Sequence, residues 1–212
     1  MRGGEAAIGN FIADSWLDWI DGADIALVNG GSIRGDRVYP AGDLTYYDAI
    51  SIIPFRNEIF EAKMTGAQIA HVLEMSASAI RFNDDYCADT CRIAYGGFLQ
   101  VAGITFEIDI SRRPFEAIYD GRSVSAIVDS GSRISNVRTV TDGEWGAIDP
   151  KGEYTVLISS WLASGGDGYY IFADEVENIK STTVFDTDIL VEYIKKNSPI
   201  SPRSETRIRM MK

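Results

Sequence analysis

Two glycine-rich polar segments, each placed directly after an apolar run, constrain the fold of this chain more than any other feature. They are residues 29–36, Asn-Gly-Gly-Ser-Ile-Arg-Gly-Asp, and residues 161–169, Trp-Leu-Ala-Ser-Gly-Gly-Asp-Gly-Tyr. Short apolar runs are typical of buried strands, and glycine permits positive φ and a close approach of the main chain to a ligand. Each strand is therefore expected to end in a loop that holds polar side chains towards a bound molecule.

The side chains on these two segments indicate the kind of ligand. The first segment contributes Arg34, and the second contributes Trp161 and Asp167. A cation, an aromatic ring and a carboxylate suit a ligand with an anionic end, a flat ring and hydroxyl groups between them. A nucleotide has this pattern.

Composition excludes several classes of partner. The 212 residues include 31 acidic and 20 basic side chains, and the formal net charge is −11. Nucleic-acid polymers and anionic membranes are poor partners for such a chain, because their binding depends on many Lys and Arg contacts. One or two arginines in a cleft still suffice for a small anion. No apolar stretch is long enough to cross a bilayer, and with 45% hydrophobic residues we expect a single domain over residues 1–212.

The scarcity of histidine and cysteine limits the chemistry of the chain. The single histidine, His71, lies beside apolar positions of a predicted helix, where a structural role is favoured over a catalytic one. With His71 assigned a structural role, no histidine remains for a serine-protease triad, and one imidazole cannot build a multi-histidine metal centre. Cys87 and Cys91 are too few for a structural zinc site. A local disulfide between them fits an exported protein and two reduced thiols fit a cytosolic one, and the disulfide is favoured.

Hydrophobic periodicity predicts the main helices and strands. Helices are expected over residues 6–20, from a capping box at Thr65 and Gln68, and over residues 188–196. The predicted strands are residues 25–28, 104–110, 124–128, 134–140 and 154–158. Helices near the two ends and strands in the middle favour an α+β fold, with mixed β-sheets flanked by helices.

Six short motifs, in order along nearly the whole chain, carry a resemblance to a known family. They are Arg2-x-x-Glu5 with Gly9-Asn10 and Ala13-Asp14, residues 29–34, residues 54–57 (Pro-Phe-Arg-Asn), residues 97–103, residues 164–169 and Arg207-Ile208. Together they resemble the C-terminal domain of the 5′-nucleotidase family, which also includes UDP-sugar hydrolases and cyclic-nucleotide phosphodiesterases. The resemblance implies the fold of that domain. It also implies the domain's function, which is to bind the nucleoside part of the substrate.

In that family the catalytic residues and two metal ions belong to an N-terminal metallophosphatase domain. The resemblance therefore implies no cofactor in this chain, divalent metals of the Zn or Mn type on the missing N-terminal domain, and no hydrolysis by this chain alone. It also implies an extracellular, periplasmic or cell-surface location. The single histidine agrees with this, because it cannot furnish a dinuclear site.

The resemblance also assigns roles to individual residues. Phe55 and Trp161 correspond to the two aromatic residues that clamp the base, although Trp161 is larger than the phenylalanine expected there. Asp167 corresponds to the acceptor of the ribose hydroxyls, and Asn29 to a polar contact with the base. Arg34 and Arg2 correspond to the cations at the phosphate end, and Gly31 belongs to the same loop.

Other interpretations remain open from the sequence. Phe55 and Trp161 could instead be core aromatics, and Asp167 could instead cap its own turn, although the base clamp and the sugar contact are favoured. The chain as a whole could be a free-standing, non-catalytic nucleoside-binding or interaction module. A third alternative keeps the enzyme and changes the substrate to a nucleotide sugar, a 2′,3′-cyclic nucleotide or another phosphate or sulfur ester.

Overall fold

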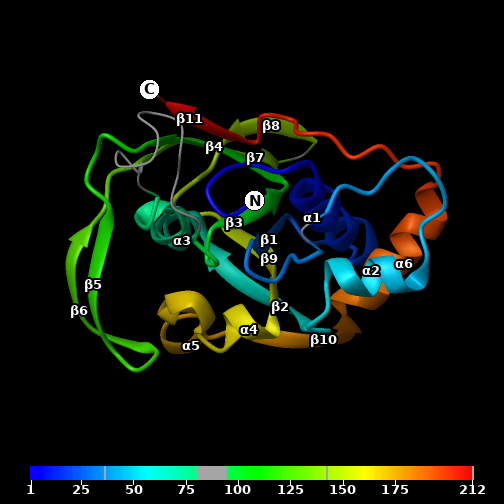
Figure 1. Cartoon of the computed structure of the whole chain (residues 1–212). Coiled ribbons are helices and arrows are strands. Elements are labelled where there is room, and N and C mark those ends of the chain that lie inside the picture. Colours follow the sequence, from blue (N-terminus) through cyan, green and yellow to red (C-terminus); the bar gives the residue numbers. More distant parts are fainter. Residues whose placement is uncertain (36, 81–94, 142, 212) are drawn as a thin grey trace.

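The structure, a computed structural model, describes residues 1–35, 37–80, 95–141 and 143–211 (Figure 1). Its helices are α1 (Ala7–Trp19), α2 (Tyr46–Ile52), α3 (Gly66–Ser78), α4 (Ser160–Ala163), α5 (Tyr170–Asp174) and α6 (Asp186–Asn197), with one 3₁₀ turn, η1 (Gly166–Gly168). Its strands are β1 (Ile25–Asn29), β2 (Glu58–Thr65), β3 (Leu99–Ala102), β4 (Ile104–Asp109), β5 (Phe115–Asp120), β6 (Ser123–Ser130), β7 (Ile134–Thr141), β8 (Glu144–Ala147), β9 (Glu153–Ser159), β10 (Ile179–Phe185) and β11 (Ile208–Met211). The α+β architecture with mixed sheets is as predicted.

A five-stranded mixed sheet forms the centre of the molecule, with strand order β10-β2-β9-β1-β3. Strands β1 and β9 run parallel, and Ile25 lies opposite Val156. The other neighbouring pairs in this sheet are antiparallel. The carboxyl ends of β1 and β9 therefore meet at the same edge, where crevices for ligands are common in sheets with parallel strands. Both glycine-rich segments leave the sheet at this edge.

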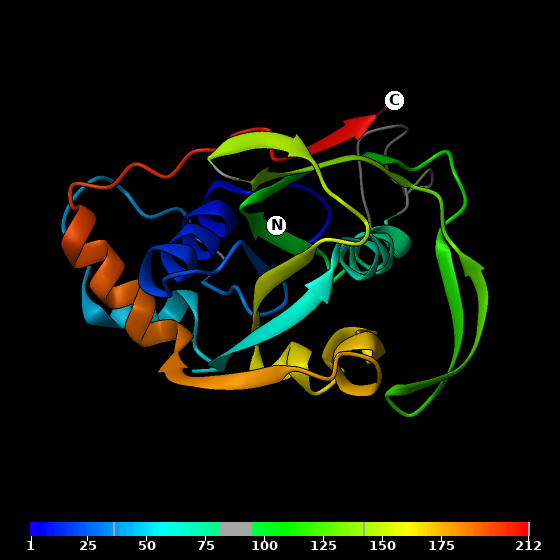
Figure 2. The same ribbon diagram turned by 180° about the vertical axis from the view of Figure 1, so that it is seen from behind.

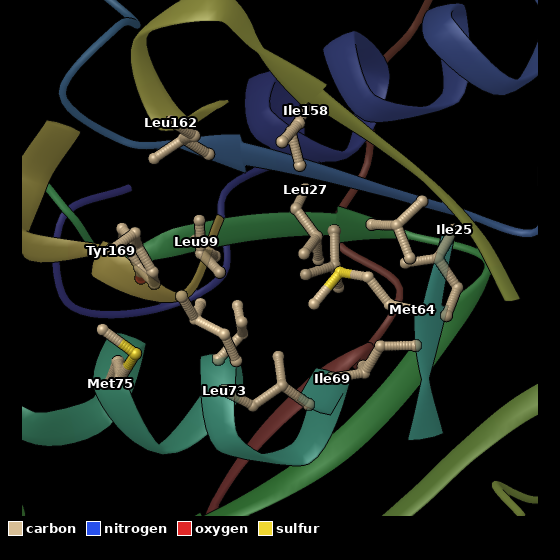
Figure 3. Packing of buried hydrophobic residues seen from close by; sticks show 14 of the residues in the cluster. Ile25, Leu27, Met64, Ile69, Leu73, Met75, Leu99, Ile158, Leu162 and Tyr169 are labelled. Carbon is tan, nitrogen blue, oxygen red and sulfur yellow. The ribbon is translucent and has the colours of Figure 1, made fainter. Parts of the chain in front are cut away.

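The central sheet is buried on both faces, which explains the unbroken apolar run of β1. Ile25 and Leu27 point into one hydrophobic cluster together with residues of α3, while Ala26 and Val28 point into a second cluster with residues of α1 and α6. Figure 3 shows the first cluster, in which side chains of α3 face those of the sheet. Helix α3 covers one side of the sheet and α1 and α6 the other (Figures 1 and 2).

Local sequence signals fix the ends of the predicted helices. Thr65 and Gln68 form the capping box at the start of α3, with Thr65 N donating to Gln68 Oε1 at 2.9 Å. Helix α1 buries the stripe that contains Ile12 and Trp16, and α6 begins two residues earlier than predicted, at Asp186. His71 lies on α3 as expected, half-buried, with Nε2 2.9 Å from the Tyr170 hydroxyl.

A four-stranded sheet and a two-stranded ribbon complete the fold. The sheet has the order β11-β4-β7-β8, and its strand β4 alternates buried and half-buried residues, as the predicted half-exposed strand requires. Strands β5 and β6 form an antiparallel ribbon that lies beside α3 at the edge of the molecule (Figures 1 and 2). Its turn carries Arg122, which reaches the segment after β9.

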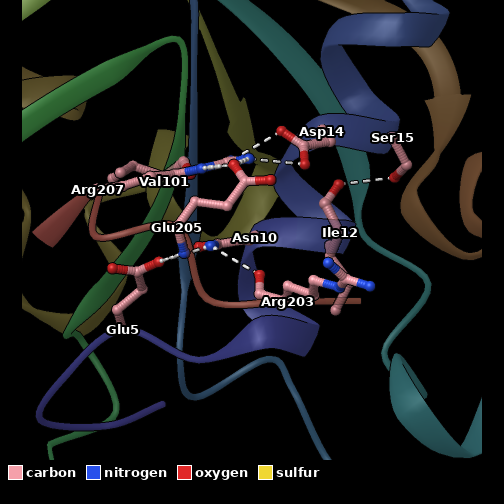
Figure 4. A network of polar contacts seen from close by, with 9 residues as sticks. All are labelled: Glu5, Asn10, Ile12, Asp14, Ser15, Val101, Arg203, Glu205 and Arg207. Atoms are coloured by element: carbon pink, nitrogen blue, oxygen red, sulfur yellow. Dashed lines mark hydrogen bonds and ion pairs between the residues drawn. The ribbon is translucent and has the colours of Figure 1, made fainter. Parts of the chain in front are cut away.

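A polar network ties the N-terminal helix to the C-terminal strand. Arg207 donates from both terminal nitrogens to Asp14 at 2.7 and 2.8 Å, and also donates to Glu205 and to the carbonyl oxygen of Val101. Glu5 accepts from Asn10 Nδ2 at 2.7 Å (Figure 4). The motif residues at the two ends of the chain thus share one network, which we call the Arg207 network: Glu5, Asn10, Asp14, Glu205 and Arg207.

Several features differ from the sequence expectations. The second glycine-rich segment does not begin as a loop, because residues 160–163 form the short helix α4, capped by the Ser159 side chain, which accepts from Leu162 N. Helices are also more evenly distributed than predicted, since α2 to α5 lie between strands. Cys87, Cys91 and their possible disulfide lie outside the described residues. In the described part of the chain, no helix combines the length and apolar character needed to span a bilayer.

Candidate functional site

One cavity of about 470 Å³ lies where β1 and β9 end. All seven residues singled out from the sequence line it: Arg2, Asn29, Gly31, Arg34, Phe55, Trp161 and Asp167. Ser32, Asn57 and Gly96 complete the lining. Its size falls within the range of small-molecule sites, about 300–1,000 Å³. Residues that are up to 165 positions apart, from Arg2 to Asp167, are thereby brought to one place.

The main chain after β1 is held close to the segment that precedes β3. Gly30 N donates to the Phe98 carbonyl oxygen at 2.7 Å, and Gly31 N donates to the Gly96 carbonyl oxygen at 2.6 Å. A Cβ atom at Gly31 would lie 3.0 Å from that Gly96 oxygen, and one at Gly30 would lie 2.3 Å from the Met1 oxygen. Glycine at both positions lets the loop form one wall of the cavity without a side chain.

Phe55 presents an exposed ring to the cavity and already contacts an arginine. Its side chain is 54% exposed, unlike that of a core aromatic. Arg34 Cζ lies 5.0 Å from the ring centroid, within cation–π range. Arg34 Nη1 also donates to the Gly31 carbonyl oxygen. The guanidinium therefore contacts both the glycine loop and the Phe55 ring.

Trp161 is held by its own helical turn and by the β5–β6 ribbon. It is 41% exposed. Arg122, from the turn of the ribbon, places Cζ 4.9 Å from the indole centroid and donates to Ser164 Oγ at 3.0 Å. Arg122 is not part of the cavity lining. One arginine therefore accompanies each of the two exposed rings.

Asp167 occupies a left-handed backbone conformation with φ of 54°. Asn29 Nδ2 donates to Asp167 Oδ2 at 2.7 Å, and the Tyr95 hydroxyl donates to the Asp167 carbonyl oxygen at 2.6 Å. Left-handed conformations are uncommon outside glycine and persist where surrounding contacts hold them. These contacts direct the carboxylate to the cavity, next to Gly96.

Asn29 keeps one hydrogen-bonding group unused. It is only 4% exposed, and its Oδ1 is buried with no hydrogen-bond partner among the described residues. A buried acceptor without a partner is energetically costly, and a ligand donor at this point would satisfy it.

Asn57 lines the cavity and is anchored by a carboxylate behind it. Its Nδ2 donates to Asp186 Oδ2 at 3.2 Å, and Asp186 N donates to the Asn57 carbonyl oxygen at 2.9 Å. Burial raises the pKa of Asp186 to about 6, against the opposing effect of hydrogen bonds from Asn57 and Thr187. The protonation state of Asp186 can thus affect the hydrogen bond that anchors Asn57 in the cavity wall.

The lining offers complementary groups but no metal-binding set. Two guanidinium groups, Arg2 and Arg34, and one carboxylate, Asp167, line the cavity together with two aromatic rings. Within the described ranges, no three His, Cys, Asp or Glu side chains are placed to share a metal ion. His71 is not among the lining residues, and burial lowers its pKa.

Sequence reasoning missed part of this site. Ser32 lies inside the recognised motif of residues 29–34, and Gly96 directly precedes the motif of residues 97–103, but neither was assigned a role. Asn57 was noted within the Pro-Phe-Arg-Asn motif without an assigned role. Arg122 lies in a ribbon turn outside every motif, and its position over Trp161 depends on the tertiary fold.

Comparison with known proteins identifies the family. Residues 1–174 match the model of the family "5′-nucleotidase, C-terminal domain". The chain is 30% identical over 214 residues to the trifunctional nucleotide phosphoesterase protein YfkN of Bacillus subtilis, covering 99% of this chain and 13% of that protein. It is 30% identical over 223 residues to a 5′-nucleotidase-related protein of Glossina morsitans morsitans, covering 98% of this chain and 35% of that protein.

A solved structure agrees with the sequence matches. The 5′-nucleotidase precursor of Thermus thermophilus superposes with a TM-score of 0.78 and 27% identity, covering 99% of this chain and 36% of that chain. The present chain therefore spans about a third or less of the length of these relatives. Fold, motifs and matches agree, and the chain belongs to the 5′-nucleotidase C-terminal domain family.

Proposed function

We propose that this chain is the nucleotide-recognition domain of a 5′-nucleotidase-family phosphoester hydrolase, with residues 1–212 acting as one domain. The observation that carries the proposal is the convergence of Phe55 with Trp161 and Asp167 on one cavity, from two segments far apart in the chain. Relatives named as nucleotide phosphoesterases and 5′-nucleotidases support nucleotides as the ligand class.

The two exposed rings suit the base. Phe55 and Trp161 line the same cavity, and burial of their exposed surface against a flat heterocycle would be favourable. Stacking contributes about 1–3 kcal/mol per base and tolerates many bases. The pair therefore favours affinity over strong selectivity, and Asn29 Oδ1 supplies an acceptor for a donor on the ligand.

The polar groups suit the sugar and the phosphate. The Asp167 carboxylate can accept charge-assisted hydrogen bonds from a vicinal diol. Arg34 and Arg2 supply guanidinium groups, whose paired donors match phosphate oxygens. In this arrangement the phosphate leaves the cavity on the arginine side, towards the metal centre of an N-terminal metallophosphatase domain.

The chemistry belongs to that partner domain in our proposal. Divalent metals of the Zn or Mn type on the N-terminal domain would supply the nucleophile and neutralise the phosphate charge. This chain would bind and orient the substrate. We also propose an extracellular or periplasmic setting, which is supported by the match to a snake venom 5′-nucleotidase of Macrovipera lebetinus.

Calorimetric titration of the purified chain with AMP, adenosine and ribose 5-phosphate tests this function. We expect AMP and adenosine to bind with dissociation constants in the range of about 0.1–1 mM, because part of the phosphate site is absent. Ribose 5-phosphate, which lacks a base, should bind at least about 10-fold more weakly.

Tryptophan variants supply the matched control. Trp161→Ala should weaken adenosine binding about 10-fold or more, whereas Trp145→Ala should leave it unchanged. Trp145 is 48% exposed, similar to Trp161, but it lies on β8 and does not line the cavity. Absence of nucleoside binding by the folded wild type at millimolar ligand, or equal losses in both variants, would refute the proposal.

A further inference from the structure

Tyr95 connects the two polar sides of the cavity without lining it. Its hydroxyl donates to the Asp167 carbonyl oxygen at 2.6 Å, and its backbone N–H donates to the Arg2 carbonyl oxygen at 2.8 Å. Asp167 and Arg2 are both lining residues, whereas Tyr95 is not. Tyr95 is therefore hydrogen-bonded to the backbones of the residues assigned to the sugar and to the phosphate. It can influence ligand binding through these residues without touching the ligand.

Tyr95 contacts Asp167 outside the lining of the candidate site. Tyr95 and Asp167 together line a separate cavity of about 610 Å³, which lies towards the β5–β6 ribbon. The phenol ring packs against Gly97, where an added Cβ would lie 2.5 Å from the ring and the hydroxyl. The ring position is thus fixed, and the hydroxyl is directed at the backbone of Asp167.

The segment that carries Asp167 needs such support. Asp167 has φ of 54°, and its neighbours Gly165 and Gly168 have φ of 77° and 82°. Three left-handed residues within four positions, two of them glycine, lose much conformational entropy when the segment is ordered. Within the described part of the chain, the carboxylate is held by one side-chain hydrogen bond, from Asn29, so its position depends on where the backbone lies.

The Tyr95 hydroxyl remains a donor over the whole neutral range. Burial raises the pKa of Tyr95 well above the ordinary value, and the nearby charge of Asp167 raises it further. A phenol that stays protonated keeps its bond to the carbonyl oxygen at every pH at which the protein would work.

We propose that Tyr95 is a positioning residue for Asp167, and that discrimination between ribose and 2′-deoxyribose nucleosides depends on its hydroxyl. The proposal rests on the nucleoside-binding function proposed above. With the Tyr95 hydroxyl present, the Asp167 carboxylate is held within hydrogen-bonding reach of the 2′-hydroxyl of the ligand. Without the Tyr95 hydroxyl, the segment relaxes, and the carboxylate no longer favours a ribose over a 2′-deoxyribose.

The test compares the dissociation constants of adenosine and 2′-deoxyadenosine by calorimetry in four proteins: the wild type, Asp167→Asn, Tyr95→Phe and the double variant. The wild type should prefer adenosine by about 10-fold or more, the scale of a hydrogen bond to a charged group. Tyr95→Phe should reduce this preference to about 3-fold or less, with the affinity for 2′-deoxyadenosine changed less than about 2-fold. The double variant should lose no more preference than Asp167→Asn alone.

Tyr169→Phe is the matched control. The Tyr169 hydroxyl also donates to a carbonyl oxygen at 2.6 Å, that of Gly97, but it makes no bond to Asp167. Both phenylalanine variants keep the aromatic ring, and circular dichroism and thermal unfolding verify that both are folded. We expect comparable losses of stability from the two variants and a loss of ribose preference from Tyr95→Phe alone.

The outcomes separate this inference from the function on which it rests. If the folded wild type binds neither nucleoside, the proposed function itself fails. If the wild type prefers ribose and Asp167→Asn removes that preference while Tyr95→Phe retains it, the role of Tyr95 is overturned and the function stands. Equal loss of preference in Tyr95→Phe and Tyr169→Phe would also overturn it, because a general structural effect would then account for the result.

Discussion

The candidate cavity and the Arg207 network are built from the same set of sequence motifs, yet their polar groups are used differently. In the network, Arg207 donates to Asp14, Glu205 and Val101, and only 12% of its side chain is exposed. In the cavity, Phe55 and Trp161 are 54% and 41% exposed, and Asn29 Oδ1 has no partner among the described residues.

The difference separates residues that hold the fold from residues available to a ligand. A motif residue whose donors and acceptors are satisfied within the chain stabilises the native state, and its loss costs folding free energy. A motif residue with exposed aromatic surface or an unused acceptor contributes little to folding and can contribute to binding. Variants in the two regions should therefore affect different measurements.

The largest effect is expected in the Arg207 network. Arg207→Met leaves the Asp14 and Glu205 carboxylates and the Val101 carbonyl oxygen without this donor. We expect the free energy of unfolding to fall by about 3 kcal/mol, towards the lower end for a buried pair because both carboxylates remain partly solvated. Denaturant unfolding measures this change, and adenosine binding by the folded fraction should not change.

Arg209→Met is the control for that variant. Arg209 pairs with Glu107 at 3.2 Å, but its side chain is 63% exposed. Exposed pairs contribute at most about 1 kcal/mol. Equal destabilisation by the two variants, or a large loss of nucleoside affinity in Arg207→Met, would contradict the claim that the Arg207 network stabilises the fold and the cavity binds the ligand.

The reverse pattern is expected for Phe55→Ala in the cavity. Removal of the ring should weaken adenosine binding by about 2 kcal/mol, or roughly 30-fold, because one stacking surface is lost. The unfolding midpoint should change little, since the ring is largely solvated. Tyr46→Ala is the matched control: Tyr46 is 60% exposed and does not line the cavity, so binding should be unchanged. A Phe55→Ala protein that binds normally and is clearly destabilised would assign Phe55 to the scaffold.

The last effect, on the pH dependence of stability, concerns Asp186, which lies behind the cavity wall. Its pKa is about 6 in the folded state and about 3.9 when unfolded, so the folded state binds the extra proton between these values. Its contribution to stability is therefore greatest below pH 4 and is lost as pH rises to about 6. Asp186→Asn removes this dependence. The stability of Asp186→Asn relative to wild type should increase by about 2 kcal/mol between pH 4 and pH 7 in urea titrations, because each unit of pKa difference corresponds to about 1.4 kcal/mol. A stability difference that does not vary with pH would contradict this prediction.

The periodic elements were predictable from the sequence because local chemistry fixes them. The capping box at Thr65, the apolar run of β1 and the alternation of β4 all appear as predicted. The edge strands β10 and β11 and the short helix α2 were not predicted. Strand β10 lacks a regular apolar spacing, and β11 and α2 are only 4 and 7 residues long, so their conformation depends on the neighbours against which they lie.

The candidate site was predictable where glycine and an aromatic or charged residue share one segment. Such segments led to the cavity lining, Gly31 and Asp167 included. The contacts of Arg122 with Trp161 and of Tyr95 with Asp167 were not predictable, because they join segments 39 and 72 positions apart. Only the folding of the ribbon and of the segment before β3 onto the α4 region brings these residues together.

A crystal structure of the chain soaked with adenosine at millimolar concentration tests the central claim most directly. We predict density for the base between the rings of Phe55 and Trp161, with the ribose hydroxyls within hydrogen-bonding distance of Asp167. Adenosine bound elsewhere on the molecule, or in this cavity with neither ring against the base, would contradict the account.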